Sequence, residues 1–245
     1  MKILLAPSET KTLGGEGSLN LDSLVLSTIN PSREEIISEY QKIVDCNNTD
    51  KLQELFGVKK ESEIQKYRVD IYNSPVKKAI ERYSGVAFDY IDYSNLDKGE
   101  QEYIDENLLI FSNLFGVLRA KDLIPIYKLK QGSTINKEKI EKFYNIILKE
   151  PLDRYLEGED ILDIRAGYYD KFYKPNKPYT TLKFLKNGKV VSHWAKAYRG
   201  MALKYAAINQ IDSIDKFTSM HIPTLELLEI RKVGLKQEII YKIEE

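Results

Sequence analysis

Short apolar runs and amphipathic segments alternate along the chain, and this alternation limits the folds that are open to it. The runs that predict strands are 2–6, 108–111, 126–130, 160–164 and 238–243. The segments with helical spacing are 32–43, 50–55, 61–72, 75–84, 98–106, 137–148 and 194–208. No long linker and no internal repeat divides them. The sequence therefore predicts a mixed α/β (α+β) fold, one domain over residues 1–245 with a central mixed sheet covered by helices.

Local capping and turn residues place several boundaries. Ser32 followed by Glu35 is typical of a capping box, and Thr49 can cap the next helix. Asn187-Gly188 is the dipeptide of a type I′ turn, so residues 181–193 predict a β-hairpin.

Composition excludes several classes of protein. No apolar run approaches the roughly 20 residues needed to span a bilayer, and the N-terminal run is too short for a signal peptide. Cys46 is the single cysteine, and His193 and His221 are the only histidines, so a thiolate or histidine metal site is not expected. We expect a cytoplasmic monomer with no metal, no cofactor and no membrane partner.

Positive charge is concentrated in one window of a chain whose net charge is zero. Residues 163–204 hold ten basic and two acidic residues, a net charge of +8, and eight aromatic residues. Basic residues interleaved with aromatic ones are typical of nucleic-acid binding. The alternative is a solvated hairpin and helix in a lysine-rich protein.

The loop after the first strand carries Ser8, Lys11 and three glycines. In a P-loop the glycines precede Lys-Ser/Thr, whereas here they follow Lys11-Thr12, so that motif is disfavoured. A catalytic Ser-x-x-Lys pair places its serine at a helix start, and Pro7 argues against a helix. A polar loop leaving a strand remains, and open α/β sheets place their ligand sites at such loops.

Two short predicted helices flank Gly57. The order apolar-Gly-apolar followed by Lys59 and Lys60 fits a helix-hairpin-helix element, which presents backbone N–H groups to DNA phosphates. A plain αα-hairpin is the alternative, since one glycine stands where two are usual.

Opposite charges stand at the ends of two further predicted strands. Arg119 and Asp122 occur in an apolar context, and Asp163 and Arg165 repeat the pattern, so these charges need partners. A structural ion pair and a polar functional cluster are both open readings. The predicted polar cluster beside the cleft comprises Ser8, Lys11, Arg119, Asp122, Tyr127, Asp163 and Arg165. We expect Lys11 to lie beside Asp122 or Asp163.

Four segments resemble a known family. They are "APSETKT" at the start, "LFGVLRAKDLIPIYKL" (114–129), "DIRAGYY" (163–169) and "AKAYRGMALKY" (195–205). Their order and spacing resemble those of the YaaA family of bacterial peroxide stress proteins, nearly end to end. The resemblance implies a cytosolic protein of the oxidative stress response that binds DNA through a basic cleft and a helix-hairpin-helix, and limits damage linked to free iron. No defined reaction accompanies it.

The resulting hypothesis is a DNA-binding protein that grips duplex or structured DNA without reading its sequence. The residues expected at the DNA are Gly57, Lys59, Lys60, Lys171, Lys174, Lys196, Arg199 and Lys204. The alternative is an enzyme that acts on a small phosphate or nucleotide in a pocket around Lys11, Arg119 and Arg165. A deep pocket favours the enzyme, and a long basic groove that reaches Gly57 favours DNA.

Overall fold

The central sheet is built around the first strand of the chain. In the computed structural model, which describes residues 1–191 and 194–244, β1 (Lys2–Leu5) pairs in parallel with two other strands. These are β10 (Ile161–Asp163) and β5 (Leu108–Ser112). The expectation that this apolar run forms a central strand is confirmed.

Four more strands extend the sheet on both sides of this parallel centre. β11 (Tyr179–Lys186) and β14 (Lys236–Ile243) continue it in parallel beyond β10. The edges are antiparallel, formed by β13 (Leu225–Val233) beside β14 and β6 (Gly116–Arg119) beside β5. A short strand, β12 (Lys189–Val190), pairs with β11.

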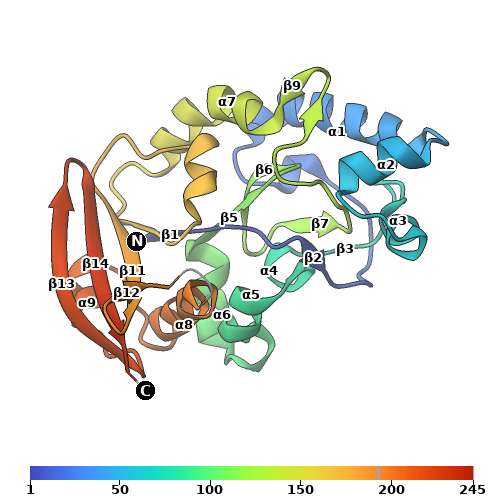
Figure 1. Ribbon diagram of the computed structural model, residues 1–245. Coiled ribbons are helices and arrows are strands. Elements are labelled where there is room, and N and C mark those ends of the chain that lie inside the picture. Colours follow the sequence, from blue (N-terminus) through green and yellow to red (C-terminus); the bar gives the residue numbers. More distant parts are fainter. Residues whose placement is uncertain (192–193, 245) are drawn as a thin grey trace.

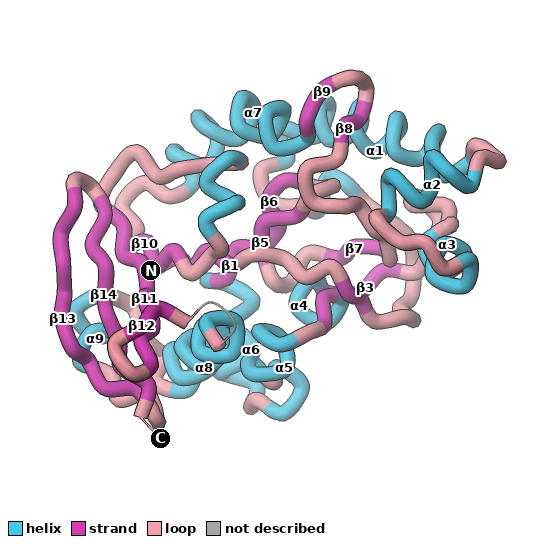
Figure 2. The backbone as a smooth tube through the Cα atoms, in the orientation of Figure 1, coloured by secondary structure: helices cyan, strands magenta, loops and turns pink. Residues whose placement is uncertain are grey.

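Helices cover both faces of the sheet (Figure 1). α1 (Asn30–Asp45) and α7 (Ile140–Tyr155) run along one side, and α5 (Val86–Ile91), α6 (Lys98–Asn107) and α8 (Ala195–Ile208) along the other (Figure 2). The buried apolar side chains form one continuous core cluster between these layers. Among the described residues, no helix is both long and apolar enough to cross a bilayer.

Shorter elements complete the structure. α2 (Thr49–Phe56) and α3 (Glu61–Tyr67) follow α1, and α9 (Ile214–Ser219) precedes β13. The remaining strands are β2 (Thr10–Lys11), β3 (Val76–Lys78), β4 (Tyr83–Ser84), β7 (Leu123–Pro125), β8 (Thr134–Ile135) and β9 (Glu138–Lys139). The other helices are α4 (Ala79–Arg82) and the 3₁₀ turns η1 (Leu21–Ser23), η2 (Ser27–Ile29), η3 (Tyr93–Asn95) and η4 (Gly167–Lys171).

The mixed α/β class and most of the long elements are as predicted. The predicted hairpin turns at Asn187 and Gly188, whose φ angles of 51° and 72° are both positive, as a type I′ turn requires. The last residue of that prediction, His193, lies outside the described residues.

Two predicted elements are wrong, because long-range pairing overrides the local pattern. Residues 126–130 form no strand, since the main chain there bonds to helices: Lys130 N–H donates to Leu55 O and Tyr40 OH donates to Lys128 O. The predicted helix 75–84 is divided into β3, α4 and β4, because β3 pairs with β7.

Helix starts and one strand also differ from the prediction. α1 begins at Asn30, with Pro31 in its first turn, rather than at Ser32. Asn48, and not Thr49, caps α2 by accepting a hydrogen bond from Lys51 N–H at 3.0 Å. The sequence reading missed β13, which is exposed along all but its first residue and so lacks the alternation of a half-buried strand.

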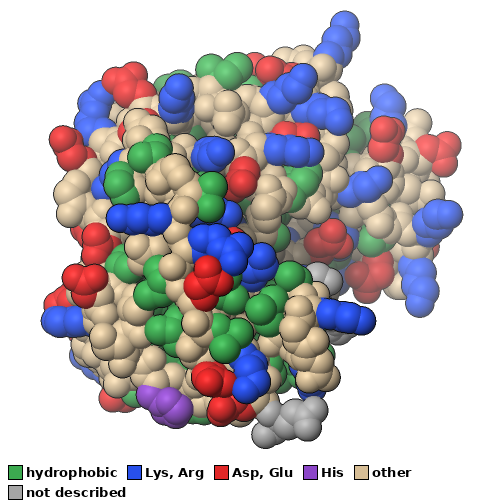
Figure 3. Space-filling view, turned by 60° about the vertical axis from the view of Figure 1, so that its left-hand side comes forward, with side chains coloured by type: hydrophobic (Ala, Val, Ile, Leu, Met, Phe, Trp, Pro, Cys, Tyr) green, Lys and Arg blue, Asp and Glu red, His purple; other side chains and the backbone are tan. Residues whose placement is uncertain are grey.

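Figure 3 shows the molecule with the side that bears β13 turned forward. Acidic and basic side chains are interspersed there, with apolar side chains between them. This side therefore has mixed charge, unlike the pocket described next.

Candidate functional site

A pocket of about 490 Å³ lies at the carboxyl ends of the parallel strands. The loop after β1 supplies residues 6–11, the turn after β5 supplies Asn113, and the segment after β10 supplies Ile164, Ala166 and Tyr169. Open α/β sheets bind ligands at this edge, because the loops that leave parallel strands meet there. The polar loop identified in the sequence therefore lines this pocket.

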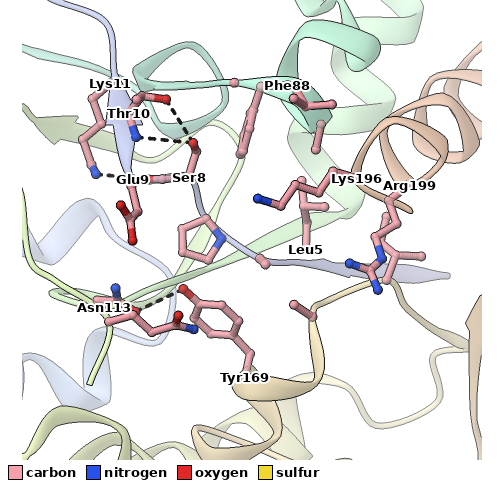
Figure 4. A pocket seen from close by; sticks show the side chains of 18 of the residues that line it. Leu5, Ser8, Glu9, Thr10, Lys11, Phe88, Asn113, Tyr169, Lys196 and Arg199 are labelled. Atoms are coloured by element: carbon pink, nitrogen blue, oxygen red, sulfur yellow. Dashed lines mark hydrogen bonds between the residues drawn. The ribbon is translucent and has the colours of Figure 1, made fainter. Parts of the chain in front are cut away.

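The opposite wall of the pocket comes from two helices. α5 contributes Val86, Ala87 and Phe88, and α8 contributes Lys196 and Arg199 (Figure 4). The Lys196 side chain is exposed and extends from α8 toward the loop after β1. The pocket thus has a basic wall that faces a polar loop.

Lys11 is the buried amine of this site. Its side chain is 6% exposed, and its Nζ donates a hydrogen bond to Ser8 O at 3.2 Å. Nζ also lies 4.2 Å and 5.0 Å from the ring centroids of Tyr127 and Tyr83. Burial, reinforced by nearby cations, lowers the pKa of Lys11 to about 7.

Three further cations surround Lys11, and each donates to main-chain oxygen. Lys66 Nζ bonds Lys11 O at 3.4 Å, and Lys128 Nζ bonds Glu9 O at 3.5 Å. Arg82 bonds Thr12 O at 2.7 Å. Main-chain carbonyl oxygens carry no net charge, so these hydrogen bonds do not neutralise the three cations. The electrostatic potential around Lys11 is therefore positive.

Arg199 brings a second, half-buried cationic side chain to the pocket. Its Nε is buried and, within the described residues, has no hydrogen-bond partner. Burial lowers the pKa of Arg199, and Asp163 opposes this effect. A guanidinium N–H without a protein acceptor is a ready donor for an anionic ligand.

Neutral polar groups complete the lining. Ser8 Oγ lies 3.2 Å from Thr10 Oγ1, and Tyr169 OH donates to Asn113 Oδ1 at 3.2 Å (Figure 4). Glu9 is the acidic residue in the lining, and it is exposed.

The predicted polar cluster is divided among three places. Ser8, Lys11 and Tyr127 meet in the pocket. Arg119 and Asp122 form a separate ion pair at 2.7 Å, in which Asp122 also accepts from Val25 N–H. β6 runs antiparallel to β5 and pairs Arg119 with Leu109 at the start of β5, so this pair lies at the opposite edge of the sheet.

Asp163 and Arg165 form the third group, a buried ion pair. Arg165 donates to both carboxylate oxygens of Asp163, at 2.8 Å and 2.6 Å, and its guanidinium stacks 4.2 Å from the centroid of the Phe111 ring. Each expected acidic partner of Lys11 is thus engaged by an arginine, and Lys11 pairs with neither.

The residues expected at DNA are also separated. Gly57 caps α2 in a left-handed conformation (φ 68°), its N–H donates to Gln53 O, and a Cβ there would lie 3.0 Å from the Lys130 side chain. The helix-hairpin-helix element is not confirmed. Lys59 and Lys60 are exposed in the connection to α3.

The remaining predicted contacts follow η4 and α8. Lys171 and Lys174 are exposed, whereas Lys204 forms an ion pair with Asp92 at 3.0 Å and is not part of the pocket lining. Among the residues that the structure describes, no group of three or more His, Cys, Asp or Glu side chains could hold a metal ion.

Sequence reasoning missed four contributors to the site. Asn113 and Lys128 lie within the charged apolar stretch 112–130, and Tyr169 lies within "DIRAGYY". The sequence pointed to both segments, but it did not single out these three side chains as part of a site. Lys66 is on α3, and only its contact with Lys11 O connects it to the pocket.

Comparison with known proteins agrees with the resemblance in the sequence. Residues 1–229 match the family model described as peroxide stress protein YaaA. An uncharacterized protein of Campylobacter jejuni is 46% identical over 244 residues, 99% of each chain. A UPF0246 protein of Corynebacterium glutamicum is 30% identical over 86% of each chain. The chain therefore belongs to the YaaA family of peroxide stress proteins.

Proposed function

We propose that this peroxide stress protein binds DNA in the cytoplasm as a monomer, and that this contact limits damage linked to intracellular free iron. Lys196 and Arg199 hold phosphate groups at the mouth of the pocket. The observation that carries the proposal is the buried Arg199 Nε without a partner among the described residues, one helical turn from the exposed Lys196. Guanidinium and ammonium groups in this arrangement suit phosphate oxygens.

The contacts between the pocket and the α2–α3 region extend the proposed surface. Lys66 of α3 bonds the main chain of Lys11, and Lys130 lies against Gly57 and next to the pocket-lining Gln131. Lys59 and Lys60 then follow on the exposed turn. Phosphate groups are the same at every base pair, so lysines that contact them do not distinguish one base from another. Binding is therefore expected to be independent of DNA sequence.

A salt series with duplex DNA tests the proposal. Each phosphate contact contributes roughly 0.9 to the slope of log affinity against log salt for duplex DNA. The double variant Lys196→Ala/Arg199→Ala should therefore flatten the slope by about two units if both side chains contact phosphate.

The matched control removes the same charge from the mixed-charge side of the molecule. Arg231→Ala/Lys232→Ala lies on exposed β13 and should leave the slope unchanged. Lys204→Ala should have a small effect, because Lys204 is already paired with Asp92. Equal slopes for the unmodified protein and the Lys196/Arg199 variant would show that this wall does not face DNA.

The volume of the pocket favours a second candidate function, the binding of a small phosphate compound or nucleotide. A volume of about 490 Å³ falls in the usual range for small-molecule sites, roughly 300–1,000 Å³. Calorimetric titration with mononucleotides and inorganic phosphate tests this candidate. Tight binding of a mononucleotide that is lost in Arg199→Ala, without any DNA binding, would favour it over the first.

A further inference from the structure

Lys11 is a buried amine in the lining of the pocket. Its Nζ donates a hydrogen bond to Ser8 O, and among the described residues it forms no ion pair. A buried lysine is normally paired, because an isolated charge loses its hydration. Here burial and the charges of Lys128, Arg82 and Lys66 lower the pKa of Lys11 to about 7, and the charge of Glu9 opposes them, so a large share of the amine is neutral at pH 7.

The aromatic groups that face Lys11 do not supply a negative charge. Tyr83 OH and Tyr127 OH lie 2.6 Å apart, and Tyr127 OH lies 2.7 Å from Ser112 Oγ. Ser112 Oγ in turn accepts from the N–H groups of Leu114 and Phe115. Burial raises the pKa of Tyr83 to about 12 and that of Tyr127 well above its usual value, so both phenols stay neutral.

The amine belongs to the pocket rather than to the core alone. Lys11 and Tyr127 both line the cavity, together with Lys196 and Arg199 on the opposite wall. Figure 4 shows Lys11 beside Ser8 and Glu9 on one side, with Lys196 reaching in from the other. A ligand between these walls meets a nucleophile at one end and an anion-binding pair at the other.

We propose that the Lys11 amine forms an imine with the carbonyl carbon of an anionic aldehyde or ketone bound in this pocket. The anionic end of the ligand is held by Lys196 and Arg199. The inference uses the anion site of the proposed function, but it does not require intact DNA as the ligand. Lysines with a desolvated amine next to other cations are the ones that act as nucleophiles in this way.

The reaction balances without an oxidant or a reductant. The Nζ lone pair forms a bond to the carbonyl carbon, the carbonyl oxygen takes up a proton, and a carbinolamine results. Loss of the hydroxyl group as water, with the second amine proton, leaves the C=N bond. Glu9 is the carboxyl group in the pocket lining and can transfer these protons.

The carbonyl group that reacts with Lys11 can come from two kinds of ligand. One is a free carbonyl compound with a carboxylate or phosphate group, and the other is the ring-opened sugar aldehyde of an abasic nucleotide in DNA. The experiment has one arm for each: glyoxylate and glycolaldehyde phosphate for the first, and a duplex with a single abasic site for the second. Each probe is incubated with the full protein and sodium cyanoborohydride, and peptide mapping locates the reduced adduct.

We expect one adduct per chain, at Lys11, with a trapping rate that rises through about pH 7 and then levels off. Surface lysines remain protonated until near pH 10, so at pH 7 the Lys11 adduct should form at least about tenfold faster than any other. Lys11→Met and Lys11→Arg should lose it, and Lys142→Met on the exposed face of α7 should retain it.

The position of the adduct in the unmodified protein tests the proposal, so the test remains valid even if a Lys11 variant folds poorly. Labelling with the small aldehydes alone assigns a free carbonyl ligand, and labelling with the abasic duplex alone assigns a DNA sugar. Adducts spread over surface lysines, with Lys11 unmodified at pH 7, overturn the proposal. Binding of intact duplex DNA can persist in that case, so failure here is distinguishable from failure of the proposed function.

Discussion

Gly200 of α8 packs directly on the main chain of Ala87 in α5. A Cβ at position 200 would lie 2.2 Å from the carbonyl oxygen of Ala87 and 2.9 Å from Tyr90 Cβ. Both helices line the pocket, and Gly200 follows Arg199 in the chain. This contact therefore sets how close the basic wall of the pocket comes to α5.

Gly200→Ala should destabilise the protein by about 1 to 3 kcal/mol, because a methyl group has no room against main-chain atoms. Urea denaturation measures the change, and DNA affinity should fall with it as Lys196 and Arg199 shift. Gly167→Ala is the control, since a Cβ there would meet no atom within 4 Å. Equal stability of both variants would show that α5 and α8 separate without penalty.

Asp163→Asn should destabilise the protein by about 3 kcal/mol, because the buried Arg165 guanidinium loses its close carboxylate partner and keeps only Asp170, at 3.7 Å. The exposed pair of Lys216 and Asp212 offers the comparison. Asp212→Asn should leave the free energy of unfolding nearly unchanged. A small effect at Asp163 would mean that water reaches Arg165.

Lys11→Met should stabilise the protein at pH 7, by an amount on the order of 2 kcal/mol. The folded state lowers the pKa of Lys11 from 10.5 to about 7, so between these values the unfolded chain binds the extra proton. Stability of the unmodified protein should therefore rise with pH across this interval, and the advantage of the variant should disappear near pH 10.5.

Denaturation of both proteins at several pH values between 6 and 10.5 measures this difference. Lys142 is an exposed lysine on α7, and Lys142→Met is the control. Its free energy of unfolding should change with pH in the same way as that of the unmodified protein. A constant difference between Lys11→Met and the unmodified protein across the whole interval would show that Lys11 keeps an ordinary pKa.

Cys46→Ser should leave protection from peroxide intact. Cys46 is a free, half-buried thiol at the C-terminus of α1, and it is the only cysteine in the chain. A redox sensor generally needs an accessible thiolate, often with a resolving partner. Survival of cells that carry the variant after hydrogen peroxide exposure checks this, and loss of survival with an unchanged fold would make Cys46 a sensor.

The local sequence pattern was sufficient to predict those strands, helices and turns that depend on residues close together in the chain. The apolar run 2–6 predicted β1, Asn187-Gly188 predicted its turn, and periodicity predicted α6, α7 and α8. The four family segments were also visible in the sequence, because their order along the chain needs no structure. Fold class and family membership could therefore be inferred without the structure.

Which charged residues contact one another depends on the three-dimensional packing and could not be inferred from the sequence. Arg119 and Lys11 both follow strands, but β6 is antiparallel, so it delivers Arg119 to the opposite edge of the sheet from Lys11. The same packing joins Lys66 of α3 to the main chain of Lys11, 55 residues away. Strand direction and long-range packing do not follow from local periodicity. They divide the predicted polar cluster and place Lys11 in the pocket without Asp122 or Asp163, the acidic partners that the sequence predicted for it.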